Sequence, residues 1–289
     1  MSKMPGIIYG TAWKKDRTQA LVRQAILAGF RGVDTAAQPK HYQERLVGCG
    51  LRDGMEQAGL GRGDIYVQTK FTSVSGQDPK SVPYDLRSSI TEQVTTSVAS
   101  SLRNLAGLSG YAEEAFVDCL VLHSPFPTQP QTAEAWRAME AHVPHSARTL
   151  GISNVYHLPT LRWLYEFAII KPAVVQNRFY RETNYDIAIR AFCAENGMVY
   201  QSFWTLTANP QLVRSKLVGD LAEIVGVSSV VALYALVSSL GNVSILNGTT
   251  NARHMVEDLV GLSKVAAWAN TNEGDWKSLQ VMFAELLRV

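Results

Sequence analysis

Residues 7–35 read IIYGTAWKKDRTQALVRQAILAGFRGVDT, and this stretch sets the architecture of the chain. The apolar run Ile7–Thr11 is typical of a buried strand. Thr18–Ala28 has the apolar spacing of a helix and ends at Gly29, and Gly32–Thr35 begins a second short strand. A strand, a helix and a strand in this order predict two parallel strands joined by a helical crossover.

The same unit repeats along the rest of the chain. We expect further strands at Ile65–Lys70, Phe116–Leu122, Thr149–Ser153, Ala173–Gln176, Met198–Ser202 and Val243–Leu246. We expect further helices at Tyr42–Ala58, Pro83–Leu105, Ala133–His142, Leu158–Phe167, Asp186–Glu195 and Arg253–Leu262. Eight such units in about 250 residues predict an α/β fold of one closed (β/α)8 barrel of the TIM type. No G-x-G-x-x-G follows the first strand, which disfavours a doubly wound dinucleotide-binding sheet. We therefore treat residues 1–289 as one domain, with a C-terminal tail from about residue 263.

Composition narrows the class of protein. The 289 residues carry 27 Lys and Arg against 25 Asp and Glu, a net charge of +2, and 46% of them are hydrophobic. This near-neutral balance gives no reason to expect a nucleic-acid or membrane partner. The three cysteines form neither a disulfide framework nor a metal motif, and the histidine spacing offers no metal triad. We expect a cytoplasmic protein without a metal, because no apolar run has the length of a signal peptide or a membrane span.

Ionisable residues gather where the predicted strands end, which is where barrels of this type place their chemistry. Asp34, Lys70 and His123 end the second, third and fourth strands, and Tyr42 follows the second. A free tyrosine has a pKa near 10, and a neighbouring ammonium lowers that pKa. We expect Lys70, held by Asp34, to make Tyr42 a general acid, and His123 to orient a carbonyl oxygen.

These residues lie in motifs that resemble the aldo-keto reductase family. The motifs, in the family's order, are Gly10-Thr11-Ala12, Phe30–Ala36, His41–Glu44, Thr69-Lys70, Leu122–Pro125, Gly151–Asn154, Val175–Asn177 and Gly248–Thr250 with Glu257–Leu259. The resemblance implies a nicotinamide cofactor across the barrel mouth and a catalytic tetrad of Asp34, Tyr42, Lys70 and His123. The stretch Pro-Lys-His-Tyr at 39–42 resembles an insertion in one subgroup, and it places the tyrosine eight residues after the aspartate instead of five.

The resemblance also assigns residues to the cofactor. They are Gly10, Thr11, Asp34, Ser153, Asn154, Gln176, Gln201, Ser202, Phe203, Gly248, Thr249, Thr250, His254, Glu257 and Asp258. Gln201 occupies a position where an aromatic residue often stacks on nicotinamide. Gly248 and His254 occupy positions where fixed cations often meet a 2′-phosphate, although backbone N–H groups at a helix start still favour an anion. We expect NADP(H), with NAD(H) as the alternative, and a modest preference that grows at lower pH, where a histidine gains charge.

Aromatic residues after the strand ends suggest the substrate. Trp13, Phe126 and Trp204 could either line the mouth beside Tyr42 and His123 or pack at the barrel rim. Together they favour an apolar or aromatic carbonyl substrate. The leading hypothesis is a reversible NAD(P)H-dependent reductase of an aldehyde or ketone. Because fold does not imply function, two alternatives stay open: a nucleotide-binding accessory protein, and a biosynthetic enzyme that uses the tetrad for acid–base chemistry without net redox.

Overall fold

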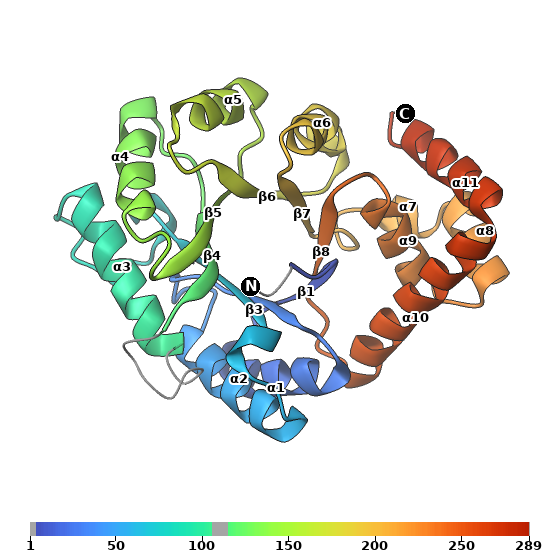
Figure 1. Ribbon diagram of the computed structural model, residues 1–289, viewed down its shortest axis with the longest axis horizontal. Coiled ribbons are helices and arrows are strands. Elements are labelled where there is room, and N and C mark those ends of the chain that lie inside the picture. The colour runs from blue at the N-terminus through green and yellow to red at the C-terminus, as the bar shows by residue number, and fades with distance from the viewer. Residues whose placement is uncertain (1–3, 106–114, 289) are drawn as a thin grey trace.

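A closed parallel barrel forms the centre of the protein (Figure 1). The structure is a computed structural model and describes residues 4–105 and 115–288. The strands are β1 (Ile7–Gly10), β2 (Gly32–Asp34), β3 (Tyr66–Phe71), β4 (Val117–Leu122), β5 (Ala147–Ser153), β6 (Pro172–Arg178), β7 (Val199–Phe203) and β8 (Val243–Asn247). They pair in chain order, and β8 closes the barrel on β1. The predicted (β/α)8 barrel is confirmed.

The first six helices cover the outside of the barrel. They are α1 (Thr18–Ala28), α2 (Glu44–Ala58), α3 (Ile90–Leu105), α4 (Gln129–Glu140), α5 (Leu158–Phe167) and α6 (Ile187–Glu195). Of these, α1 and α5 begin and end at the predicted residues. The third begins at Ile90 instead of Pro83, because Ser89 and Glu92 form a reciprocal cap there: the Ser89 N–H donates to the Glu92 carboxylate, and the Glu92 N–H donates to the Ser89 hydroxyl.

Three helices between β7 and β8 were not predicted. They are α7 (Pro210–Val213), α8 (Lys216–Val225) and α9 (Ser229–Ser238). The α9 sequence, SVVALYALVS, is apolar on every side, and residues 231–237 are buried. A helix that is buried all round carries no amphipathic period, so its sequence does not reveal it.

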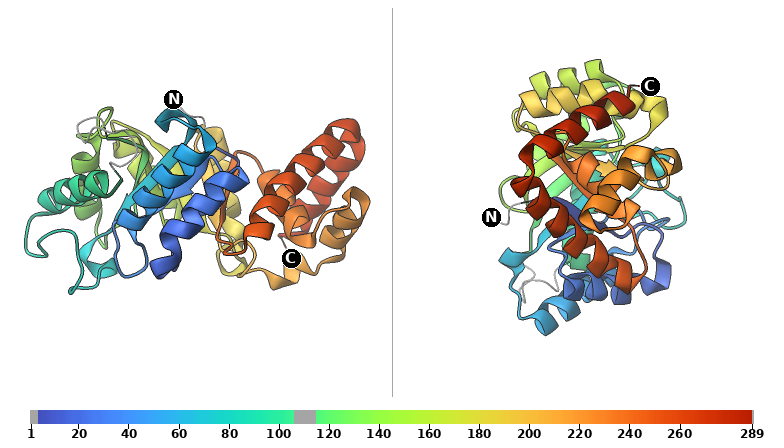
Figure 2. Two further views of the ribbon diagram at one scale, coloured as in Figure 1. Left: turned by 90° about the horizontal axis from the view of Figure 1, so that it is seen from below. Right: turned by 90° about the vertical axis from the view of Figure 1, so that its right-hand side faces the viewer.

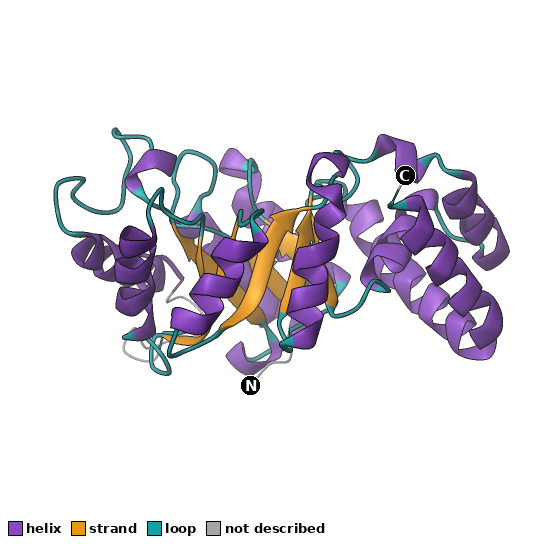
Figure 3. Ribbon diagram, turned by 90° about the horizontal axis from the view of Figure 1, so that it is seen from above, coloured by secondary structure: helices purple, strands orange, loops and turns teal. Residues whose placement is uncertain are grey.

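The C-terminal helices form a lobe beside the strands (Figures 2 and 3). Helix α10 runs without a break over Ala252–Thr271, past the expected end at Leu262 and past the point where a tail was expected to begin. It is followed by α11 (Glu273–Leu286), which buries Phe283 completely. In the described ranges no single helix could span a membrane by length and apolarity; α8 and α9 pass that test only as a pair, with a bend of 104° between them.

Close packing of α2 fixes the segment that carries Tyr42. A Cβ at Gly50 would lie 2.5 Å from the Gln19 carbonyl oxygen of α1, and a Cβ at Gly48 would clash with the Asn104 carbonyl oxygen of α3. Only glycine allows both neighbouring helices to approach this closely. The N-terminal half of α2, which begins two residues after Tyr42, is therefore held on both sides.

Candidate active site

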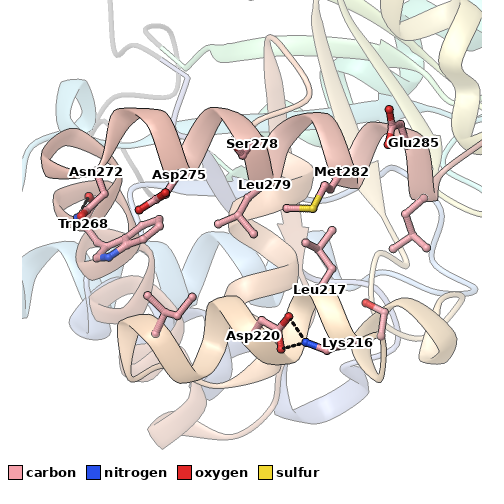
Figure 4. Close-up of a pocket in the computed structure, with 13 residues that line it drawn as sticks. Lys216, Leu217, Asp220, Trp268, Asn272, Asp275, Ser278, Leu279, Met282 and Glu285 are labelled. Carbon is pink, nitrogen blue, oxygen red and sulfur yellow. Dashed lines mark hydrogen bonds and ion pairs between the residues drawn. The ribbon is translucent and has the colours of Figure 1, made fainter.

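Two hollows stand out on the molecule. One, of about 990 Å³, lies between α8 and α11 of the lobe (Figure 4). Its floor is largely apolar, with Leu217 and Leu279 among its lining residues, and Lys216 and Asp220 at its edge bond to each other. The other, of about 790 Å³, lies at the carboxyl ends of the strands. The residues with acid–base chemistry lie at the second hollow, which we call the mouth cavity.

A buried ion pair lies beneath the mouth cavity. The Lys70 ammonium donates to both oxygens of the Asp34 carboxylate, at 2.7 Å each, and to the Thr35 carbonyl oxygen at 2.8 Å. Lys70 is 1% exposed and Asp34 is 2% exposed. Burial lowers the pKa of Lys70, but Asp34 and Tyr42 more than offset this, so the net pKa is raised and the ammonium stays charged.

Tyr42 lies above this pair at the cavity wall. The Lys70 nitrogen is 5.1 Å from the centre of the Tyr42 ring, close enough for its charge to act on the tyrosine hydroxyl. Burial raises the pKa of Tyr42, and the Lys70 charge lowers it by less, so the net pKa is raised. This corrects the expected net lowering: Lys70 acts in the expected direction, but burial outweighs it. Tyr42 therefore keeps its proton at neutral pH.

His123 lies at the same wall, with its ring 6.1 Å from the Tyr42 ring. Burial, together with the positive charge of Lys70, lowers the pKa of His123 to about 3, so the imidazole is neutral. The Thr72 hydroxyl is 2.6 Å from His123 Nδ1. The Asn154 side chain fixes the backbone of His123 by donating to its carbonyl oxygen at 2.9 Å. The structure thus brings the four predicted tetrad residues together.

Three buried glutamines form a polar layer around Asp34 inside the barrel. Gln68 and Gln176 both donate to Asp34 Oδ1, at 2.6 and 3.0 Å. Gln201 exchanges two hydrogen bonds of 2.8 Å with Gln68 and accepts a third from Gln176. Barrel interiors are usually filled by branched apolar side chains, so this layer is an exception at the level of the site.

A sequence profile of the Aldo/keto reductase family matches residues 6–216. This chain belongs to that family. The match covers all strands from β1 to β7 and the four tetrad residues.

The curated relatives of this chain are distant. The uncharacterized oxidoreductase YtbE of Bacillus subtilis is 29% identical over 205 residues, which are 70% of this chain and 63% of that protein. The uncharacterized oxidoreductase P32A8.02 of Schizosaccharomyces pombe is 26% identical over 89% of this chain and 82% of its own length. The glyoxal reductase of Bacillus subtilis is 26% identical over 70% of this chain and 62% of its own length. The chain therefore spans less than two thirds of the length of both Bacillus relatives.

Solved aldo-keto reductases share the fold. The aldose reductase of Giardia lamblia superposes with a TM-score of 0.72 at 20% identity, over 91% of this chain and 88% of that one. The Bombyx mori aldo-keto reductase AKR2E4, solved in complex with NADP, gives a TM-score of 0.71 at 20% identity over the same shares.

Most of the cofactor residues expected for an aldo-keto reductase line the mouth cavity. They are Gly10, Asp34, Ser153, Asn154, Gln176, Phe203, Gly248, Thr249, His254, Glu257 and Asp258. Several of their polar groups already bond within the protein: the Ser153 hydroxyl donates to the Gln176 carbonyl oxygen, and Asp258 accepts from Asn247. Glu257 pairs with Arg253 on the exposed side of α10.

Four of the expected cofactor residues lie outside the cavity lining. Thr11 is buried and donates to the Asp34 carbonyl oxygen at 2.8 Å. Ser202 is buried and bonds to the Thr205 hydroxyl. Gln201 belongs to the polar layer and is 0% exposed, and Thr250 is exposed at the start of α10. Thr11, Ser202 and Gln201 are therefore buried behind the cavity wall and do not form part of its surface.

Of the three aromatic residues expected to contact the substrate, two line the cavity and one does not. Trp13 and Trp204 line the cavity and are 60% and 50% exposed. Trp13 packs on His41 at a ring distance of 3.6 Å, and the Arg178 guanidinium lies 4.2 Å from the centre of the Trp204 ring. Phe126 lies outside the lining and stacks on Phe71 at the rim of the core.

Lys14 is a site residue that the sequence reasoning missed. It is 8% exposed, lines the cavity and donates from its ammonium to the Gly248 carbonyl oxygen. Burial, and to a lesser extent Arg17, lowers the pKa of Lys14 to about 8. Lys14 directly follows Trp13, two residues after the motif Gly10-Thr11-Ala12, and this position is the sequence signal that could have identified it as a site residue. It supplies a cation beside the segment that was expected to have none.

The described residues contain no group of three or more His, Cys, Asp or Glu side chains that could hold a metal ion.

Proposed function

We propose that this protein is an NADP(H)-dependent reductase of aldehydes or ketones that also runs in the reverse direction. The observation that carries the proposal is the Lys70 ammonium, buried between the Asp34 carboxylate and the Tyr42 ring at the mouth of a closed barrel. Such a cluster can deliver a proton and stabilise the anion left behind. Family membership and relatives named as reductases, among them a glyoxal reductase, agree with it.

The residues present fit a nicotinamide dinucleotide phosphate. Arg178 lines the mouth cavity, and in the described part of the chain its Nε is buried without a hydrogen-bond partner. Gln176 lines the same cavity and its Oε1 accepts no hydrogen bond from the described residues, and Lys14 offers a cation. Ser153, Asn154 and Gln176 would hold the carboxamide end, and Lys14 with the start of α10 would hold phosphate. A solved relative of similar fold that binds NADP supports this choice of cofactor.

The chain's own residues divide the proton chemistry among them. The cofactor, when bound, supplies the hydride that reaches the carbonyl carbon. The Tyr42 hydroxyl gives its proton to the carbonyl oxygen, and the raised pKa keeps that proton available at neutral pH. Lys70 then stabilises the Tyr42 phenolate, and Asp34 holds Lys70 in place.

His123 orients the substrate. In its neutral form the ring can accept from the Thr72 hydroxyl at Nδ1, and in that tautomer its proton is on Nε2. That N–H can donate to the carbonyl oxygen beside Tyr42. The walls formed by Trp13 and Trp204 favour an apolar or aromatic carbonyl compound.

The test is direct. The purified protein is mixed with NADPH and a panel of aliphatic and aromatic aldehydes and ketones, and nicotinamide absorbance is followed. Carbonyl-dependent NADPH oxidation that is lost in Tyr42→Phe supports the proposal. Tight NADPH binding without turnover on any carbonyl contradicts it and favours a nucleotide-binding accessory role.

A further inference from the structure

The polar layer in the barrel interior is built from two pairs of side chains on neighbouring strands. Asp34 of β2 is in register with Gln68 of β3, and Gln176 of β6 is in register with Gln201 of β7. Side chains in register point to the same side of a parallel sheet, and here all four point inward. Gln68 and Gln201 are 0% exposed, and Gln176 is 3% exposed.

Asp34 and Gln201 together set the orientation of the Gln68 and Gln176 amides. A carboxylate only accepts hydrogen bonds, so Gln68 and Gln176 must both present their Nε2 groups to Asp34. The second N–H of each amide then points at Gln201 Oε1, at 2.8 Å. Gln201 Nε2 in turn donates to Gln68 Oε1 at 2.8 Å and to the Met4 sulfur at 3.4 Å. All six amide N–H groups are therefore used.

One acceptor is left over. Gln176 Oε1 accepts no hydrogen bond from the described residues, and Gln176 lines the mouth cavity. Turning the Gln176 amide over would place this oxygen against Asp34 Oδ1 and Gln201 Oε1, two acceptors in a buried site. Such an arrangement leaves buried polar groups unpaired, which is costly.

We propose that Gln68 and Gln201 are positioning residues that lock the Gln176 amide with its oxygen toward the mouth cavity, where it accepts a hydrogen bond from the carboxamide N–H of the nicotinamide. This inference rests on the proposed function, since it needs the cofactor. In this inference Gln201 acts by holding Gln176, where the sequence position suggested stacking on the nicotinamide ring. Gln68 acts by holding Gln201.

The test compares two ligands by isothermal titration calorimetry. One is NADP⁺, and the other is its 3-acetylpyridine analogue, in which a methyl group replaces the carboxamide amino group. The analogue keeps the carbonyl group and the phosphates but cannot donate to Gln176. The parent protein should bind NADP⁺ about fivefold more tightly, the worth of one neutral hydrogen bond.

Replacing either Gln201 or Gln68 should remove the preference for NADP⁺ over the analogue without weakening the binding of the analogue. Gln201→Met keeps the side-chain length and removes the amide that fixes Gln176. We expect the preference for NADP⁺ to fall to within about twofold, while the Kd of the analogue changes by less than about twofold. Gln68→Met removes both hydrogen bonds between Gln68 and Gln201 and gives an independent measurement should Gln201→Met fail to fold. Gln93→Met, a buried glutamine of α3 that donates to the Ser88 carbonyl oxygen, is the matched control and should keep the full preference.

The outcomes separate the two proposals. Full preference in both Gln201→Met and Gln68→Met overturns the positioning role, and so does equal weakening of both ligands, which would indicate a general loss of structure. Equal affinity of the parent for both ligands overturns it as well, because Gln176 Oε1 would then accept nothing. A parent that binds neither ligand contradicts the proposed function itself, and the inference with it.

Discussion

Replacing Lys14 with methionine should abolish a pH dependence of cofactor binding that follows from the lowered pKa of this lysine. Lys14 has a pKa of about 8 in the ligand-free protein, because burial disfavours its charge. A phosphate group beside it binds the charged form. The charged fraction falls from about nine-tenths at pH 7 to about one-tenth at pH 9, and the apparent Kd varies inversely with that fraction. The Kd for NADPH should therefore rise about tenfold over this range.

The assay is fluorescence titration of NADPH at about pH 7, 8 and 9 and constant ionic strength. In Lys14→Met the Kd should be high and nearly flat with pH. Lys15→Met is the matched control, since Lys15 is the exposed neighbour of Lys14 and should leave the pH profile of the parent unchanged. A flat profile in the parent, or the same slope in Lys14→Met, would refute the assignment of Lys14 to the phosphate.

Three further predictions concern the site and its support. Tyr42→Phe should lower reductase turnover by about 10²–10⁴-fold while NADPH affinity stays near that of the parent, and near-normal turnover would mean another proton donor. Lys70→Met leaves the Asp34 charge buried without its partner, so turnover should fall and the free energy of unfolding should drop by about 3–5 kcal/mol. An unfolding curve in denaturant that matches the parent would contradict this prediction. Burial raises the pKa of Glu44, so folded Glu44 keeps a proton that the unfolded chain releases, and its contribution to stability falls as pH rises above about 4.5. Glu44→Gln should therefore gain stability relative to the parent as pH rises above about 4.5, and a stability difference that stays constant with pH would contradict the raised pKa of Glu44.

The strands were predictable because each is a short apolar run that ends in a polar residue. The same alternation placed Asp34, Lys70 and His123 at one edge of the barrel without any tertiary information. Helix α9 escaped because it is buried on all sides, and α10 was cut short at Leu262 because the pattern beyond it could also be read as a separate tail.

The parts of the site that escaped prediction depend on contacts between distant strands. Lys14 reaches Gly248 only because β1 closes on β8, and in the sequence only its place directly after Trp13 separates it from Lys15. Gln201 was assigned to the cofactor by its place in a motif, whereas its partners Gln68 and Gln176 lie on two other strands. The net pKa of Tyr42 likewise follows from burial, which the sequence does not report.

Closure of the barrel between β1 and β8 also has a consequence for folding. Ile7 pairs with Ile245, so the last hydrogen-bonded seam joins residues from nearly opposite ends of the chain. During synthesis the outer edge of β1 stays without its partner until β8 has emerged, although Asp34, Tyr42 and Lys70 are made early. Contacts this far apart in sequence form slowly, and an unpaired strand edge invites association with other chains. The nascent chain therefore spends most of its synthesis with an open sheet, and its yield of native protein should depend on temperature and on chaperones more than its final stability would suggest.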